Sequence, residues 1–229
     1  MQKKALVLSS GGIDSTTCLA LAVREFGFEN VASLSIFYGQ KHRVELRAAH
    51  AVADYYGVRQ YEFDLSQILQ FSNCALLSGS TQKISHDTYG EQVAENGCKV
   101  ATYVPFRNGL MLSAAASLAQ SLYEHELCTL YLGAHQDDAA GNAYADCSVP
   151  FLEYIGQAID IGTYGKVRLA APFAHCNKAA VVARGLELGV PYHLTWSCYE
   201  GGERPCGECA TCRDRAAAFA ANGVADPAR

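Results

Sequence analysis

The chain of 229 residues is half apolar and 18% charged, a composition that is ordinary for a globular protein. Its formal charge of −5 argues against a general nucleic-acid-binding protein, which would need a large basic face, so we expect no nucleic-acid partner. Because no run approaches the roughly 20 apolar residues that span a bilayer, and the first residues form no secretory signal, we expect a cytoplasmic protein without a membrane partner.

Short apolar runs alternate with longer amphipathic stretches along most of the chain. We expect strands at residues 4–9, 31–38, 61–65, 129–134 and 166–171. We expect helices at residues 15–26, 41–56, 108–124, 148–162, 177–188 and 213–221. Because strands that alternate with helices of this length pair in parallel, the sequence predicts an α/β protein with a doubly wound, Rossmann-like parallel sheet.

Two parts of the chain depart from this alternation. Residues 66–100 are polar, with turn-forming segments at 78–80 and 95–97. We expect an insertion there, which is either a lid or substrate loop, or a disordered surface excursion. The last residues carry four clustered cysteines. We therefore expect one domain at residues 1–195 and a C-terminal metal-binding segment, residues 196–229, packed on it.

The segment between the first expected strand and helix is rich in glycine and hydroxyl groups. In a parallel sheet, ligands bind beyond the carboxyl ends of the strands, and the exposed amides of a helix N-terminus favour an anion. Two adjacent glycines let the backbone approach such an anion closely. We expect this segment to bind the phosphates of a nucleotide through Leu8, Ser9, Ser10, Gly11, Gly12, Ile13, Asp14, Ser15, Thr16, Thr17 and Cys18.

Asp14 and Ser15 are also candidate catalytic residues. An acid beside phosphates is repelled unless it is neutralised, so Asp14 either caps the helix or helps to hold Mg²⁺. The alternative for the whole segment is a tight turn without a ligand, in which Asp14 or Ser15 is the N-cap. The segment lacks the G-x-x-x-x-G-K-S/T pattern, whose lysine contacts the terminal phosphates, and this disfavours kinase-style phosphoryl transfer.

Four of the ten cysteines gather near the end of the chain: Cys198, Cys206, Cys209 and Cys212. In a reducing compartment, four thiolates this close in sequence suit a tetrahedral Zn²⁺ ion, which would be structural because no coordination position stays open. An iron–sulfur cluster is the alternative, since C-x₂-C-x₂-C also occurs in ferredoxins. We expect the others to be small buried or surface residues, with a further role left open for Cys147; they are Cys18, Cys74, Cys98, Cys128, Cys147 and Cys176.

Five short segments, in chain order, resemble those of the 7-cyano-7-deazaguanine synthases, a family of the ATP-pyrophosphatase (PP-loop) superfamily. They are the SGGxDS loop at 10–15, Tyr38-Gly39-Gln40-Lys41-His42 with Glu45, Tyr103-Val104-Pro105-Phe106-Arg107-Asn108, Tyr144-Ala145-Asp146-Cys147, and the cysteine-rich stretch from Trp196 to Arg215. Alanine stands at 145 where the family has proline. The resemblance covers nearly the whole chain and implies an adenine nucleotide alpha hydrolase-like fold with a zinc-binding tail.

This resemblance implies an ATP-dependent carbon–nitrogen ligase of queuosine biosynthesis, which converts 7-carboxy-7-deazaguanine and ammonia to the nitrile. ATP would be cleaved between its α- and β-phosphates. The acid would be adenylated and ammonia would displace AMP to give an amide, whose oxygen would be activated and expelled in the same way. Free ammonium is the expected nitrogen source, and the resemblance suggests a homodimer.

The resembling segments contain the remaining candidates for the site. Arg107 would pair with the substrate carboxylate or a phosphate, or else form a surface salt bridge. His42 would help to move a proton from ammonium, or else be a structural histidine at the start of a helix. Asn108 would either cap a helix or touch the ligand, and Asp146 would either bond a guanine-like edge or order its loop. Further candidates in these segments are Gln40 and Glu45, and one candidate outside them is Asp64, at the end of the third strand.

Three other functions compete with this interpretation. One is a different PP-loop enzyme, such as a tRNA thiolase or an amidotransferase-type synthetase. Another is a paralogue that serves deazaguanine modification of DNA or of a protein. The third is a zinc-ribbon nucleic-acid-binding module without catalysis, which the acidic charge and the intact phosphate loop oppose.

Overall fold

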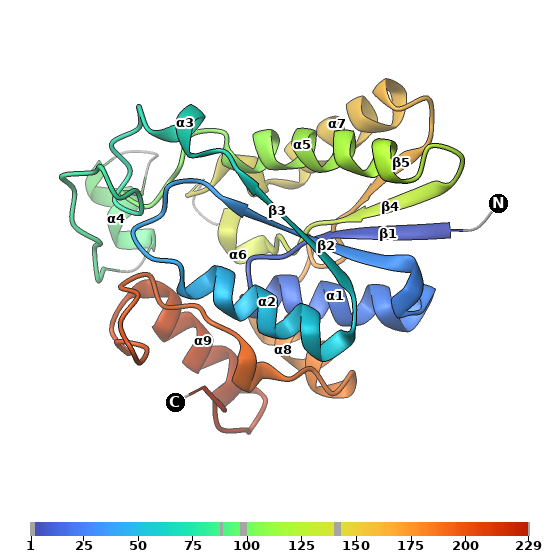
Figure 1. The fold of residues 1–229 in the computed structure, drawn as a ribbon. Helices are drawn as coiled ribbons and strands as arrows, with labels where there is room; N and C mark the ends of the chain where they lie inside the picture. The colour runs from blue at the N-terminus through green and yellow to red at the C-terminus, as the bar shows by residue number, and fades with distance from the viewer. Residues whose placement is uncertain (1–2, 88, 97–99, 140–142, 229) are drawn as a thin grey trace.

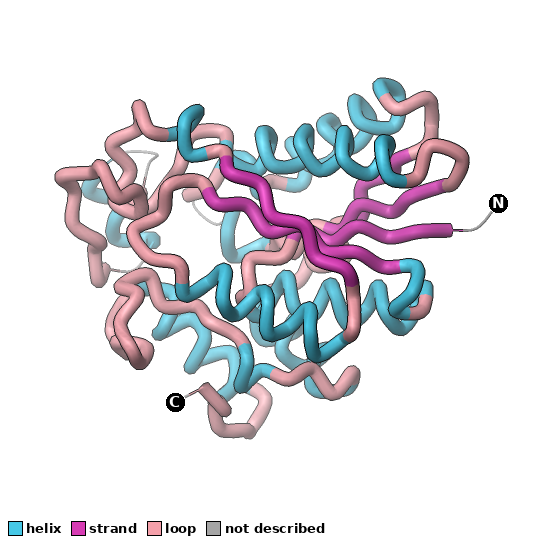
Figure 2. The backbone as a smooth tube through the Cα atoms, viewed as in Figure 1, coloured by secondary structure: helices cyan, strands magenta, loops and turns pink. Residues whose placement is uncertain are grey.

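The computed structural model describes residues 3–87, 89–96, 100–139 and 143–228. In these residues, parallel pairing joins β1 (Lys3–Leu8), β2 (Val31–Phe37), β3 (Arg59–Asp64), β4 (Leu127–Tyr131) and β5 (Val167–Ala170) into one sheet of order β3-β2-β1-β4-β5. Helices lie above and below this sheet (Figures 1 and 2). The predicted doubly wound α/β fold is therefore confirmed.

The helices follow the predicted alternation with small shifts of their ends. They are α1 (Ile13–Phe26), α2 (Val44–Tyr56), α3 (Ser66–Leu69), α4 (Tyr89–Asn96), α5 (Arg107–Leu122), α6 (Gln136–Ala139), α7 (Val149–Gly162), α8 (Lys178–Glu187) and α9 (Ala210–Ala221). The second begins at Val44 and not at Lys41, because the backbone of Gln40 pairs with Leu77 and the amide of Lys41 donates to Leu76, which draws this stretch away from the helix.

Alternation along the strands divides the core into two layers. In β1, Ala5 and Val7 face α1, α8 and α9, whereas Leu6 and Leu8 face α5 and α7. Figure 1 shows α5 and α7 on one face of the sheet and α1, α2, α8 and α9 on the other. With apolar side chains buried on both faces, the central strands read as the nearly continuous apolar runs seen in the sequence.

The described part of residues 66–100 packs on the rest of the chain. Leu69, Leu76 and Leu77 are buried against Tyr38 and Val104. In Figure 1 this part, with α3 and α4, lies beyond the carboxyl ends of the strands. A lid would occupy the same place, but its role and the division of the chain into 1–195 and 196–229 stay predictions.

The C-terminal segment is fixed to the sheet layer through α9. Phe219 is fully buried and packs edge-on against Tyr192. Arg215 forms two hydrogen bonds with the Asp226 carboxylate, at 2.8 and 2.9 Å, and both side chains are only 4% exposed.

Among the described residues, no helix is long and apolar enough to cross a bilayer.

Candidate nucleotide and substrate site

A cavity of about 700 Å³ opens at the carboxyl ends of the central strands. The chain runs from β1 outward to β2 and β3, and then returns to the other side of β1 as β4 and β5, so the order reverses between β1 and β4. Parallel sheets bind ligands at such a switch point. The volume lies within the range of small-molecule sites.

The turn between β1 and α1 forms one wall of this cavity. Gly11 has a φ of +77°, and a Cβ there would lie 2.5 Å from backbone atoms of Glu45 and Ala49, so the turn fits directly on α2. Gly12 is the N-cap of α1, and no side chain caps the helix. The first amides of α1 therefore remain available to an anion in the cavity, and neither Asp14 nor Ser15 is the N-cap.

Asp14 instead belongs to a buried group of charges. Lys178 Nζ lies 3.0 Å from Asp14 Oδ2 and 3.3 Å from His135 Nε2, and His135 Nε2 lies 3.5 Å from Asp138 Oδ1. The amide of Lys178 donates to Asp137 Oδ2 at 2.8 Å. These residues come from α1, from the loop and short helix after β4, and from the start of α8, and they all line the cavity.

Burial and charge compete in this group. Burial acts to raise the pKa of Asp14, but the charges of Lys178 and His135 outweigh it, and the pKa lies below its ordinary value. For Lys178, burial acts in the opposite direction, and Asp14 and Asp138 hold the pKa above its usual value. At neutral pH the site thus contains a charged lysine beside the glycine turn that precedes α1.

A second polar group lies at the α5 side of the cavity. The guanidinium carbon of Arg107 lies 5.2 Å from the centre of the Tyr38 ring, and Glu45 lines the same wall. Burial raises the pKa of Glu45 to about 7, although Arg107 acts to lower it. Asn108 donates its side-chain amide to Cys147 Sγ at 3.1 Å, and burial raises the pKa of this thiol, so Cys147 is protonated at neutral pH.

The structure brings most of the candidate nucleotide-binding residues to the cavity. Those lining it are Leu8, Ser9, Ser10, Gly12, Ile13, Asp14 and Ser15. Gly11 packs on α2, and the side chains of Thr16, Thr17 and Cys18 are fully buried and do not line the cavity. Thr17 Oγ1 lies 2.9 Å from the hydroxyl of Tyr192.

The other candidates divide between the cavity and its surroundings. Those lining it are Gln40, Glu45, Arg107, Asn108 and Cys147. His42 and Asp64 do not line it: Nε2 of His42 lies 3.0 Å from the carbonyl of Tyr199, and exposed Asp64 accepts from the Ser66 amide. Asp146 accepts from the Asn108 amide at 2.8 Å, so its carboxylate holds the start of α5, and Asn108 does not cap that helix.

Sequence reasoning missed several residues that line this cavity: His135, Asp137, Asp138, Lys178, Trp196, Tyr199 and Asp214. For four of them, the position in the sequence just after an expected strand could have pointed to the site. His135, Asp137 and Asp138 follow β4, and Lys178 follows β5 at the first turn of a helix. Polar residues just beyond the carboxyl ends of parallel strands deserve the same weight as the glycine turn after β1.

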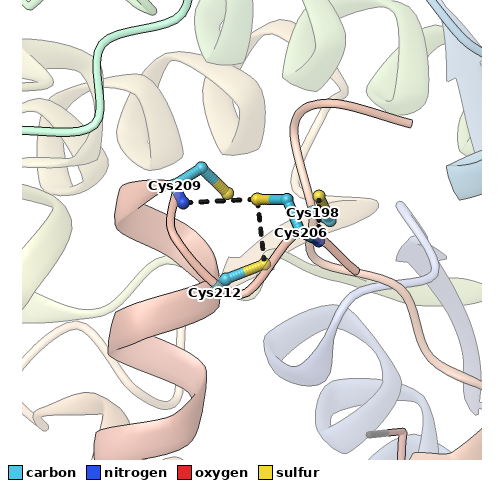
Figure 3. Close-up of side chains that lie close together, drawn as sticks. All are labelled: Cys198, Cys206, Cys209 and Cys212. Carbon is cyan, nitrogen blue, oxygen red and sulfur yellow. Dashed lines mark hydrogen bonds between the residues drawn. The ribbon is translucent and has the colours of Figure 1, made fainter. Parts of the chain in front are cut away.

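The four clustered cysteines meet in one place. Figure 3 shows their side chains converging from the start of α9 and the preceding loop. The sulfur atoms all lie within 4.8 Å of one another. The amide of Cys206 donates to Sγ of Cys198, and the amide of Cys209 donates to Sγ of Cys206, each at 3.3 Å. Four converging thiols with amide donors around them could hold a metal ion.

Comparisons with known proteins point to one family. The family model described as queuosine biosynthesis protein QueC matches residues 4–223. The 7-cyano-7-deazaguanine synthase of Archaeoglobus fulgidus is 41% identical over 98% of this chain and 89% of its own length. That of Chromohalobacter salexigens is 41% identical over 98% and 84%, and that of Oceanobacillus iheyensis 38% identical over 98% and 97%.

Two solved structures align with the chain at low similarity. The NH3-dependent NAD synthetase from Campylobacter jejuni aligns at 15% identity with a TM-score of 0.47, over 83% of this chain and 66% of its own. The tRNA thiolase NcsA from Methanococcus maripaludis aligns at 17% identity with a TM-score of 0.48, over 96% and 67%. Both likenesses are too distant to bear on function.

Proposed function

The chain belongs to the family of queuosine biosynthesis protein QueC, and on this premise we propose that it makes 7-cyano-7-deazaguanine from 7-carboxy-7-deazaguanine, ammonia and ATP. The single observation that carries the mechanism is the cavity at the switch point, where an uncapped helix N-terminus faces a buried lysine. The enzyme is then a carbon–nitrogen ligase of queuosine biosynthesis. Sequence similarity to named synthases over nearly the full length of the chain favours this reaction over tRNA thiolation or a paralogous modification pathway.

The reaction requires two activations of the same carbon. A carboxylate oxygen attacks the α-phosphorus of ATP, pyrophosphate leaves, and ammonia displaces AMP from the adenylate to give the amide. The amide oxygen then attacks the α-phosphorus of a second ATP, so that a second pyrophosphate leaves and the nitrogen loses one proton. Loss of AMP together with the remaining proton on nitrogen leaves the nitrile. Each step develops negative charge on phosphate oxygens, which the site must stabilise.

Named residues supply that stabilisation. The amides at the start of α1 and the Ser10 and Ser15 hydroxyls bind the departing pyrophosphate, and Lys178 neutralises charge beside it. Across the cavity, Arg107 pairs with the carboxylate of the deazaguanine. His42, whose ring lies outside the cavity wall, acts at most by positioning the Tyr199 backbone.

Mg²⁺ accompanies the nucleotide. The residues fit such an ion, because Asp14 Oδ1 is buried without a hydrogen-bond partner among the described residues, and Asp137 and Asp138 line the same wall. Bound there, the ion would neutralise phosphate charge.

The four cysteines hold a structural Zn²⁺ ion. In tetrahedral zinc–thiolate sites the sulfurs lie roughly 4 Å apart, and the observed limit of 4.8 Å between the ligand atoms is compatible with one ion. A cluster of several irons would spread its thiolates more widely.

We further propose that the protein works in the cytoplasm as a homodimer, takes free ammonium, and binds neither nucleic acid nor membrane.

Product analysis tests this function. The protein is incubated with ATP, ammonium and 7-carboxy-7-deazaguanine, and the products are identified by mass spectrometry. We expect the nitrile, with two equivalents each of AMP and pyrophosphate. Formation of ADP and phosphate would contradict the proposed cleavage, and absence of turnover with this base would reject the substrate.

A further inference from the structure

We propose that Glu45 is the group that accepts a proton from ammonium and so releases ammonia for attack on the adenylate. The inference rests on the proposed function and assigns one further step to the same cavity. Its basis is that Glu45 lines the cavity, contacts the proposed nucleotide turn through its backbone, and has a carboxylate that interacts with Arg107.

Glu45 lies on the first turn of α2, and its backbone is part of the wall that carries the phosphate-binding turn. A Cβ on Gly11 would lie 2.5 Å from the Glu45 carbonyl oxygen, so the two segments are in direct contact. The side chain also lines the cavity, as do Tyr38 and Arg107. Glu45 thus lies beside the turn proposed to hold the nucleotide and lines the same cavity as the arginine proposed to hold the substrate.

The environment of this carboxylate suits proton transfer at neutral pH. Burial, opposed by Arg107, brings its pKa to about 7, close to the operating pH at which a general base is most effective. Tyr38 faces it from the end of β2 and Arg107 from α5. The other titratable or charged groups that line the cavity are Asp14, His135, Asp137, Asp138, Cys147, Lys178, Tyr144, Tyr199 and Asp214.

Other groups are less suited to this step. Asp14 is already paired with Lys178 at 3.0 Å. Cys147 is a neutral thiol bonded to Asn108, and His42 lies outside the cavity wall. The carboxylates of Asp137, Asp138 and Asp214 interact with Lys178 or His135. Among the described residues that line the cavity, Glu45 is therefore the carboxylate beside Arg107 that is available as a base.

The proton balance of amide formation defines the role. Ammonium gives one proton to the Glu45 carboxylate, and the nitrogen lone pair forms the C–N bond. The C–O bond to AMP breaks, and the adduct nitrogen loses a second proton to the departing phosphate. The protonated Glu45 returns its proton to solvent before the next ammonium binds.

Replacing Glu45 separates this step from adenylation. The E45Q variant keeps size and hydrogen bonding but cannot accept a proton, so acid-dependent exchange of pyrophosphate into ATP, measured without ammonium, should stay within about twofold of the parent. The kcat/KM for ammonium should fall by about 100-fold near pH 7. Hydroxylamine, which is uncharged at neutral pH, should be used almost equally well by both proteins.

The pH profile gives a second readout. For the parent, kcat/KM for total ammonium rises as Glu45 ionises and levels off above about pH 7. For E45Q it should lack this break and rise about tenfold per pH unit with the fraction of free ammonia. E45D should restore part of the rate, and D54N, on the exposed side of the same helix, should change nothing.

Three results would overturn the inference. One is E45Q with the parent's ammonium kinetics and pH break. Another is an equal loss of pyrophosphate exchange and amide formation, which would make Glu45 a binding or adenylation residue. The third is a parent protein that does not exchange pyrophosphate into ATP when the acid substrate is present. This result would reject the proposed function itself, and it is distinguished from the other two because it is measured on the parent protein alone.

Discussion

Lys178 shows how a single side chain can decide the electrostatics of the site. Its side chain is only 15% exposed, and its ammonium group lies between the carboxylate of Asp14 and the ring of His135. A buried cation needs partners, and in the proposed mechanism the same charge stabilises an incoming phosphate. The residue was not found by motif reasoning, because lysine at the start of a helix has no distinctive local pattern.

Replacement of Lys178 by methionine should remove this charge while keeping the length of the side chain. We expect acid-dependent pyrophosphate exchange to fall by about 100- to 1,000-fold, as when a charge-stabilising donor is lost. K3Q, which alters an exposed lysine at the start of β1, is the matched control and should leave exchange unchanged. Undiminished exchange in K178M would remove the lysine from the mechanism.

Glu45 also makes a prediction about stability. Its pKa rises from 4.5 to about 7 on folding, so the native state binds more protons than the unfolded state in this range, and stability falls as pH rises through it. E45Q lacks this penalty. Its free energy of unfolding should therefore exceed the parent's by on the order of 2 kcal/mol above about pH 7 and match it below about 4.5, as measured by urea denaturation.

A stability difference that is independent of pH would contradict this assignment. It would mean that the Glu45 carboxylate is as well solvated in the folded as in the unfolded chain. Functional groups that cost stability in this way are expected in active sites, where the site is built for chemistry and not for folding.

At the scale of elements, the site depends on close packing between β4 and α1. A Cβ on Gly133 would lie 2.7 Å from the carbonyl carbon of Asp14 and 2.8 Å from the amide nitrogen of Ser15. Neither backbone atom can move without shifting the start of α1. The glycine therefore sets how near the charged loop after β4 approaches the glycine turn before α1.

Substitution of Gly133 by alanine should displace this turn. We expect a loss of about 1–3 kcal/mol in the free energy of unfolding and a raised KM for ATP. G162A is the control, because its Cβ would meet nothing within 4 Å, and it should leave both quantities nearly unchanged. If G133A bound ATP as the parent does, the close contact between β4 and α1 would not control the site.

The elements themselves could largely be predicted from sequence. Apolar runs such as β1 and β2 were recognised because strands buried on both faces are continuously apolar, and turn residues marked the ends of the helices. Loop contacts between distant segments could not be predicted. The stretch at 41–43 continues a helical pattern locally, but pairing of Gln40 with Leu77 overrides it.

For the site, local motifs could be predicted from the sequence, whereas contacts between distant residues could not. The glycine turn and the four cysteines are local patterns, and the structure brings each of them together. His135 and Lys178 are 43 residues apart in the chain and meet only because β4 and β5 end side by side. Such a constellation depends on sheet order, which a single sequence specifies only indirectly.

For the whole molecule, the metal centre should matter more to folding than to chemistry. The four cysteines belong to the C-terminal segment, and Trp196, Thr211 and Asp214 of the same segment line the cavity. A metal ion would therefore fix one wall of the site. Its loss should loosen that wall and lower the stability of the whole protein.

Metal removal tests this directly. We expect about one equivalent of zinc per chain by elemental analysis, and a chelator should lower the melting temperature and raise the KM for ATP. C206S should lose the metal, whereas C176S, which changes one of the scattered cysteines, should retain it. Iron and acid-labile sulfide in the purified protein would contradict the zinc assignment.

The central claim concerns where ATP binds, and a structure with a non-hydrolysable ATP analogue tests it most directly. The account predicts that the β- and γ-phosphates lie on the amides of residues 11–15 beside Lys178, with the α-phosphate facing Arg107 across the cavity. A triphosphate bound elsewhere, or one whose γ-phosphate faces Arg107 in place of the α-phosphate, would contradict it.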